Sequence, residues 1–148
     1  MQKCTLALGC FWKPEETFKS KAGIIETEVG YAGGLNERVT YEEVCNGNTG
    51  HAEVVRLTFD ENIISFKKIL DLFFKMHDPT QKDMQYPDVG TQYRSEIFYE
   101  TDQQKQEASK ILNEFNKKFD GKIQTNISKI KNYCKAEEYH QKYIEKNK

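Results

Sequence analysis

Alternating hydrophobic and polar residues predict three strands in the first part of the chain. Lys3–Leu8 is apolar on both faces and is followed by the turn residue Gly9, as expected of a buried strand. The other two strands follow from a period of two, and the first of them stops at Gly33-Gly34. The residues that share a face are Ile25, Thr27, Val29 and Tyr31 in one strand and Val55, Leu57 and Phe59 in the other.

Helical spacing and capping residues predict the helices that separate these strands. Glu15–Ala22 reads as a short helix with Pro14 in its first turn, and Ser65 caps a second. Thr101 with Gln104 forms a capping box for a third helix. The inner stripes are Phe66, Ile69, Leu70, Phe73 and Phe74 in the second helix, and Ala108, Ile111, Leu112, Phe115 and Phe119 in the third.

The remaining elements complete a β-α-β-β-α-β order followed by α-β-α. They are a strand over Ser95–Tyr99, a last strand through Ile123, Thr125 and Ile127, and a final helix over Ala136–Ile144. This order predicts an α+β fold with a ferredoxin-like split β-α-β core, a two-layer sandwich with a C-terminal extension. Two long stretches without periodicity, Ala32–Ala52 and His77–Arg94, are expected to form the functional loops.

Composition narrows the class of protein. With 148 residues, 37% hydrophobic and 30% charged, residues 1–148 are expected to form one domain with a real core. A formal net charge of −1 argues against nucleic acid or an anionic membrane as the main partner. No apolar run approaches the roughly 18 residues of a membrane span. No signal peptide is recognised at the N-terminus, so a cytoplasmic protein is expected. We also expect it to be a monomer.

The four cysteines carry the candidate chemistry. In a cytoplasmic chain Cys4, Cys10, Cys45 and Cys134 should be reduced, and no Cys-x-x-Cys spacing suggests a zinc site. Cys10 lies between a buried strand and a helix N-terminus, where the helix dipole and Lys13 would lower its thiol pKa. From position alone, a nucleophile and an inert buried cysteine are about equally well supported.

Four other residues extend this hypothesis. Phe11 and Trp12 could plug the core, or could line an apolar pocket beside a reactive thiol. If a strand begins at Ala52, Glu53 lies on its apolar face, where a raised pKa would make it a general acid. A frayed strand that leaves Glu53 in water is the slightly better supported alternative from periodicity alone. His51 could instead pair with Cys10, as in thiol hydrolases.

A family resemblance covers nearly the whole chain, from about residue 5 to residue 147. Gly9-Cys10-Phe11-Trp12 resembles the signature of the A-type peptide methionine sulfoxide reductases. The other collinear blocks that resemble this family are Gly30–Gly34, Val39–Cys45, Gly50–Val54, His77–Pro79, Asp88–Ser95 and Ala136–Tyr143. A four-residue motif can recur by chance, whereas ordered blocks over a whole chain do not.

The resemblance implies an enzyme that repairs methionine S-sulfoxide, free or in proteins, through a Cys10 sulfenic acid. It implies that Glu53 is the acid and that Tyr41 and Tyr93 hold the sulfoxide oxygen or support Glu53. It further implies that Phe11 and Trp12 receive the methyl group and that Asp88 contacts the substrate backbone or organises the site. No metal or bound cofactor is implied, only an external thiol reductant, either thioredoxin or glutathione with glutaredoxin.

The sequence departs from the family pattern in three places, and the missing tail among them bears on recycling of the enzyme. Lys13-Pro14 stands where the signature usually ends in Gly, and the Cys-bearing tail of many members is not found. In the C-terminal block the aromatic that commonly precedes Pro-Ala-Glu is replaced, which gives Tyr133-Cys134-Lys135-Ala136-Glu137. Cys134 or Cys45 could therefore resolve the sulfenic acid. Direct reduction by an external thiol is slightly favoured, and Cys4 is expected to be packed in the core. Some relatives carry selenocysteine at the Cys10 position, and the sequence leaves open whether the natural residue here is cysteine.

Two other classes of function remain open at this point. One is a ferredoxin-like binding module that keeps the signature without catalysis. The other is a thiol hydrolase that uses Cys10 with His51.

Overall fold

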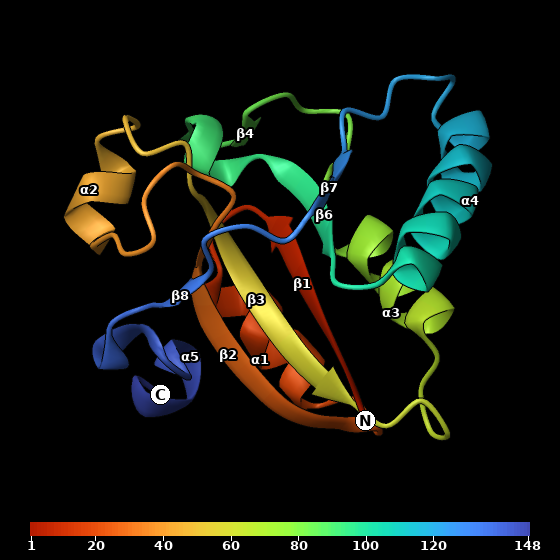
Figure 1. The fold of residues 1–148 in the computed structure, drawn as a ribbon, viewed down its shortest axis with the longest axis horizontal. Coiled ribbons are helices and arrows are strands. Elements are labelled where there is room, and N and C mark those ends of the chain that lie inside the picture. The colour runs from red at the N-terminus through yellow and green to blue at the C-terminus, as the bar shows by residue number, and fades with distance from the viewer.

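The structure, a computed structural model, describes residues 1–148. Its central sheet has six strands. The strands are β1 (Gln2–Leu8), β2 (Ile24–Ala32), β3 (Ala52–Phe59), β6 (Ser95–Tyr99), β7 (Asn126–Lys129) and β8 (Cys134–Lys135). Their order across the sheet is β7-β6-β1-β3-β2-β8 (Figure 1). β6 and β7 are parallel, and the other neighbouring strands are antiparallel.

The inner strands β6-β1-β3-β2 form the core that the sequence predicts. Helices α1 (Trp12–Lys19) and α3 (Phe66–Met76) cover one face of the sheet, so β1-α1-β2 and β3-α3-β6 make the two split β-α-β units (Figure 1). The predicted α+β fold with a two-layer core is confirmed. Helix α4 (Asp102–Lys118) packs beside α3 and leads to the added strand β7.

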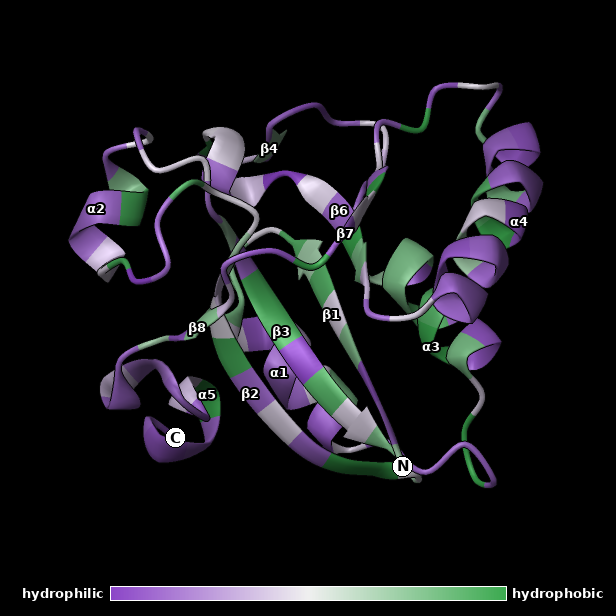
Figure 2. Cartoon of the chain, in the orientation of Figure 1, coloured by the Kyte–Doolittle hydropathy of each residue, from purple (hydrophilic) through white to green (hydrophobic).

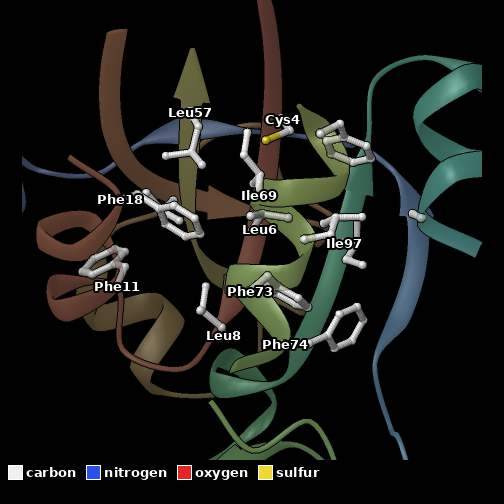
Figure 3. Packing of buried hydrophobic residues seen from close by; sticks show 14 of the residues in the cluster. Cys4, Leu6, Leu8, Phe11, Phe18, Leu57, Ile69, Phe73, Phe74 and Ile97 are labelled. Atoms are coloured by element: carbon white, nitrogen blue, oxygen red, sulfur yellow. The ribbon is translucent and has the colours of Figure 1, made fainter. Parts of the chain in front are cut away.

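The main core lies between the sheet and helices α1 and α3. Figure 3 shows Leu6 and Leu57 of the sheet facing Phe18 of α1 and Phe73 of α3, with Cys4 in the same layer. A smaller cluster on the opposite face contains Ala7, Ala32, Ala52, Val54 and Phe98, and is covered by Ile130 and Tyr133. In Figure 2 the hydrophobic colours follow the central strands and α3, while α4 is largely hydrophilic.

The predicted caps are confirmed at α3 and only partly at α4. Ser65 accepts a hydrogen bond from the Lys68 amide, and Thr101 accepts one from the Gln104 amide. The reciprocal half of the predicted capping box at Thr101 is wrong. The Gln104 side chain accepts from the Glu100 amide and donates to the carbonyl of Lys3, because that strand lies within its reach.

Helix α1 begins and ends earlier than the predicted Glu15–Ala22. Its first backbone hydrogen bond runs from the Glu15 amide to the carbonyl of Phe11, at 3.3 Å. Pro14 precedes that bond, so its missing N–H removes no helical hydrogen bond and the helix can start before it. The turn at Ser20 then ends the helix.

Two strand details also differ from prediction. Ile25 does not share the inner face with Thr27, because a β-bulge between Ile24 and Glu26 turns its side chain outward, where it is 52% exposed. The last strand begins at Asn126 instead of Ile123. The Ile123 amide bonds the Asn116 side chain and the next amide bonds a loop carbonyl, so neither pairs with β6.

The predicted helix over Ala136–Ile144 is wrong. The segment forms a 3₁₀ turn, η2 (Glu138–His140), and a short helix, α5 (Tyr143–Lys146), separated by Lys142 at φ 51°. Tertiary hydrogen bonds explain the break. The Gln141 side chain bonds both the amide and the carbonyl of Val29, and the Lys142 amide donates to the buried carboxylate of Glu15.

The two long loops contain short elements that periodicity did not reveal. The first holds helix α2 (Tyr41–Cys45), which a full capping box of Thr40 and Glu43 begins. The second holds the hairpin β4 (Met84–Gln85) and β5 (Asp88–Val89), and the turn η1 (Thr91–Tyr93). None of the helices is both long enough and apolar enough to span a membrane.

Candidate active site

The turn between β1 and α1 places a thiol beside two backbone amides that have no partner within the helix. Gly9 adopts φ 96°, which lets the chain turn sharply out of β1, and Cys10 follows at the start of the helix. The amide of Phe11 donates to Glu53 Oε1 at 3.3 Å, and the amide of Trp12 donates to the Cys10 sulfur. One helix N-terminus therefore holds both a carboxyl group and a thiol.

The Cys10 thiol is less acidic than the sequence led us to expect. Burial, together with the negative charges of Glu53, Asp88 and Cys45, raises its pKa to about 11, while the Trp12 amide opposes this rise. The Lys13 side chain is exposed and does not contribute. The expected lowering of the Cys10 pKa by Lys13 and the helix dipole is therefore wrong, because desolvation dominates at this position.

Glu53 is a buried acid on the apolar face of β3. Its side chain is 1% exposed and lies in phase with Val55 and Leu57, so the strand-phase interpretation is right and the frayed-strand alternative is wrong. Burial raises the pKa of Glu53 to about 8; the Phe11 amide lowers it, and Asp88 raises it further. At neutral pH the carboxyl group is mostly protonated and can donate a proton.

Tyr41, Tyr93 and Asp88 reach this centre from the two long loops. Tyr41 is the first residue of α2, Tyr93 ends η1, and Asp88 begins β5. Burial, followed by other effects that include the charge of Glu53, raises the pKa of both tyrosines, so both keep their phenol protons at neutral pH. Asp88 acts electrostatically on Cys10 and on Glu53. The structure thus brings together residues that are far apart in sequence.

The aromatic pair after Cys10 divides between core and surface. Phe11 is 1% exposed and belongs to the main core. Trp12 is half-buried and stacks on Tyr143 with 3.8 Å between the ring centroids. Its indole Nε1 donates to His140 Nδ1 at 3.0 Å. Each of the two interpretations of this pair therefore describes one residue: Phe11 fills the core, and Trp12 is available as a wall.

Two residues of the C-terminal segment that sequence reasoning missed support the site. His140 is buried, and its ring packs against Tyr41 with 4.5 Å between centroids. The carboxylate of Glu137 accepts hydrogen bonds from the Tyr31 hydroxyl and from the Tyr41 amide, each at 2.8 Å. The predicted helix over Ala136–Ile144 did not indicate these contacts. The only signal for these residues was the family block that contains them.

The other candidates lie in different surroundings. His51 Nε2 bonds the Asn132 carbonyl at 3.1 Å, so the structure forms no His51–Cys10 pair. Cys4 is buried in the core as expected, and all four thiols are free. The Cys134 thiol donates to the Val39 carbonyl at 3.9 Å, whereas Cys45 is exposed and close enough to act electrostatically on Cys10.

Sequence comparison links this arrangement to known proteins. Residues 2–148 match the family model described as peptide methionine sulfoxide reductase. A curated relative, the peptide methionine sulfoxide reductase MsrA of Pelagibacter ubique, is 56% identical over 146 residues, which are 99% of each chain. The MsrA of Methanosarcina mazei is 50% identical over 148 residues, covering 99% of this chain and 70% of the relative.

Solved structures agree with the sequence comparison. Reduced Mxr1 from Saccharomyces cerevisiae matches with a TM-score of 0.95 and 41% identity, over 99% of this chain and 85% of Mxr1. Methionine sulfoxide reductase A of Corynebacterium diphtheriae gives a TM-score of 0.95 and 34% identity, over 99% and 74%. Mxr1 in complex with Trx2 gives a TM-score of 0.69 and 30% identity, over 96% and 84%.

Proposed function

The chain belongs to the peptide methionine sulfoxide reductase family, and on that basis we propose that Cys10 is its nucleophile and Glu53 its acid. The protein is an oxidoreductase that reduces methionine sulfoxide to methionine, with electrons from an external thiol and without a bound cofactor. The observation that carries the residue assignment is the buried Glu53 carboxyl, whose pKa is about 8, held at the same helix N-terminus as Cys10.

The first step joins two events that each need the other. The Cys10 sulfur attacks the sulfoxide sulfur while Glu53 protonates the sulfoxide oxygen, which otherwise leaves poorly. The thiol proton of Cys10 restores the proton that Glu53 has given up. The oxygen then passes to Cys10, methionine departs, and Cys10 is left as a sulfenic acid. The sulfoxide gains two electrons and the cysteine loses two.

The surrounding residues supply recognition of the two ends of the sulfoxide group. The tyrosine hydroxyls of Tyr41 and Tyr93 donate to the sulfoxide oxygen or support Glu53. Trp12, backed by the buried ring of Phe11, receives the methyl group, and Asp88 contacts the substrate backbone or organises the site. A polar oxygen site beside an apolar wall distinguishes a methyl sulfoxide from water.

The substrate is the S-epimer, either free or in a protein, because A-type enzymes take one of the two sulfoxide epimers. We place the enzyme in the cytoplasm as a monomer, with residues 1–148 acting as one catalytic domain. Repair of oxidised proteins is the process that this activity serves.

Recycling of Cys10 requires a second thiol. Thioredoxin is supported as the donor by the likeness to Mxr1 in complex with Trx2. Direct reduction by an external thiol such as glutathione with glutaredoxin is the simpler route, because no other cysteine of this chain bonds Cys10. If an internal cysteine resolves the sulfenic acid, the exposed Cys45 is better placed than Cys134, whose thiol faces the Val39 carbonyl.

Turnover of methionine S-sulfoxide with dithiothreitol tests the assignment. Cys10→Ser should abolish turnover while circular dichroism remains unchanged, and Glu53→Gln should slow it strongly. His51→Ala should retain it, because that side chain bonds Asn132. Loss of activity in His51→Ala with full activity in Glu53→Gln would favour a thiol hydrolase instead. A wild-type protein without turnover would favour a binding module.

Intact mass after one turnover without reductant tests the recycling route. A gain of one oxygen would mean a persistent sulfenic acid, and a loss of two hydrogens would mean a disulfide. Peptide mapping would then distinguish Cys45, Cys134 and Cys4 as the partner of Cys10.

A further inference from the structure

A depression in the surface reaches the Cys10 thiol. It is a groove of about 430 Å³ between the first turns of α1 and the end of α3, and Cys10, Lys13, Thr17, Lys75 and Asp88 are among its lining residues. Apart from Cys10 and Asp88, none of the residues to which we assign a role in sulfoxide reduction lines it. The groove therefore gives access to the Cys10 sulfur along a surface that Glu53 does not line.

The groove carries two cations that no acidic side chain of the protein neutralises. Lys13 lies in the first turn of α1 and Lys75 in the last turn of α3, and both side chains are exposed. Neither forms a salt bridge, although ten other ion pairs occur on this protein. Asp88 contributes a single negative charge beside Cys10. The groove thus offers two sites for anions and one for a cation.

We propose that this groove binds a small peptidic thiol with two carboxylates and one ammonium group, of the glutathione type, that reduces oxidised Cys10. Lys13 and Lys75 pair with the two carboxylates, and Asp88 faces the ammonium group. This proposal rests on the proposed function, since it names the reductant of the same cysteine. It also gives a role to Lys13, which the sequence singled out and which does not activate the thiol.

The chemistry needs two molecules of the thiol. The first thiolate attacks the Cys10 sulfur, the sulfur–oxygen bond breaks, and hydroxide leaves and takes up the thiol proton as water. The product is a mixed disulfide. A second thiolate then attacks the sulfur of the bound reductant and releases Cys10, so that one disulfide of the small thiol and one water are formed. Two electrons move from the two thiols to Cys10.

The direction of attack favours a reductant over an acidic substrate peptide as the occupant. A thiolate displaces hydroxide most readily when it approaches the sulfur opposite the oxygen. In the proposed first step the oxygen lies beside Glu53, which does not line this groove, so the groove is the open approach for the thiolate. A polypeptide with acidic residues beside its methionine sulfoxide is the competing occupant, and the test below includes it.

The test compares two thiols that share one backbone and differ in whether the two carboxyl groups are charged or esterified. Turnover of free methionine S-sulfoxide is measured with limiting glutathione and with limiting glutathione diethyl ester, in the wild type and in Lys13→Gln/Lys75→Gln. The ratio of the two rate constants should fall roughly three- to ten-fold in the double variant, because two exposed ion pairs are lost. Since screening weakens exposed pairs, high salt should lower the wild-type ratio and leave the variant ratio unchanged.

A matched control removes two exposed lysines elsewhere. Lys122→Gln/Lys129→Gln changes the net charge equally and should keep the wild-type ratio. An unchanged ratio in Lys13→Gln/Lys75→Gln, or an equal fall in the control, would overturn the proposal. A rise in KM only for sulfoxide peptides with flanking acidic residues would also overturn it, in favour of a substrate site. Dithiothreitol, which carries no charge, distinguishes failure of this site from failure of the proposed function. No turnover with dithiothreitol would mean that the proposed function itself has failed.

Discussion

The backbone amide of Phe11 donates a hydrogen bond to the carboxyl oxygen Oε1 of Glu53 across 3.3 Å. This bond joins the acid on β3 to the turn that carries Cys10. It also favours the ionised carboxylate, yet burial outweighs it and the pKa of Glu53 stays at about 8. The amide therefore fixes the position of Glu53 without removing its proton at neutral pH.

The first prediction concerns the pH dependence of sulfenic acid formation. A general acid works while protonated, so the single-turnover rate of the wild type should fall as pH rises through about 8, the pKa of Glu53. Glu53→Gln should be slower by roughly 10²- to 10⁴-fold and should lack this fall. Rapid-quench measurement of methionine formation between pH 6 and 10 would check both; a wild-type rate that rises across pH 8 would contradict the assignment.

The second prediction concerns alkylation of Cys10. Because burial and nearby negative charge raise its pKa to about 11, its reaction with iodoacetamide should be slow at neutral pH and should increase far above the ~8.5 of a free thiol. Glu53→Gln removes one negative charge and should shift the alkylation profile to lower pH. Exposed Cys45 provides an internal reference in the same peptide map. A half-point below that of a free thiol would restore the expectation of an activated thiolate.

At the site, the sequence predicted the placement of Glu53 correctly and the pKa of Cys10 wrongly. The phase of β3 placed Glu53 on the buried face correctly, since alternation in a strand is a local property. The pKa of Cys10 was wrong, because a helix N-terminus and Lys13 are visible in sequence whereas desolvation is not. Burial depends on packing of the loops that bear Tyr41 and Asp88, and no local pattern encodes that packing.

The fold shows the same division. Residue patterns gave the core strands and α3 nearly to their ends, with the Ser65 cap included. The predicted helix over Ala136–Ile144 failed because Gln141 and Lys142 exchange helical hydrogen bonds for contacts with Val29 and Glu15. These partners lie more than a hundred residues away in sequence. A tertiary contact of that kind overrides helical propensity without any mark in the local composition.

The third prediction concerns acid stability and His77. The half-buried imidazole lies between the Phe73 carbonyl and the Ser95 hydroxyl, and desolvation lowers its pKa to about 4. A lowered pKa means that neutral His77 stabilises the folded protein at pH values above 6.5, the pKa of the group in the unfolded chain. This stability is lost as the pH falls through about 4, the pKa in the folded protein. The full loss corresponds to roughly 3 kcal/mol.

Urea unfolding at several pH values would measure this effect. His77→Gln cannot be protonated, so its free energy of unfolding should be lower at pH 7 but should vary less between pH 6.5 and 4. The difference between the two proteins isolates His77 from other groups, such as Glu53. Parallel curves for the two proteins over this range would show that His77 does not couple folding to protons.

The last prediction uses Trp12, the only tryptophan of the chain, as its own reporter. An indole N–H can only donate, so the 3.0 Å bond to His140 Nδ1 requires a neutral imidazole with its proton on Nε2. Burial lowers the pKa of His140, which favours this neutral form. His140 is thus a positioning residue for the Trp12 wall.

Two substitutions separate positioning from packing. His140→Leu leaves the indole N–H without an acceptor, whereas the amide oxygen of His140→Asn can accept near the place of Nδ1. His140→Leu should raise KM for methionine sulfoxide several-fold and increase acrylamide quenching of the Trp12 emission; the loss of one buried hydrogen bond, worth roughly 1–3 kcal/mol, sets the scale. His140→Asn should recover most of both values. Equal quenching and equal KM in the two variants would show that His140 acts by filling space and not through its bond to Trp12.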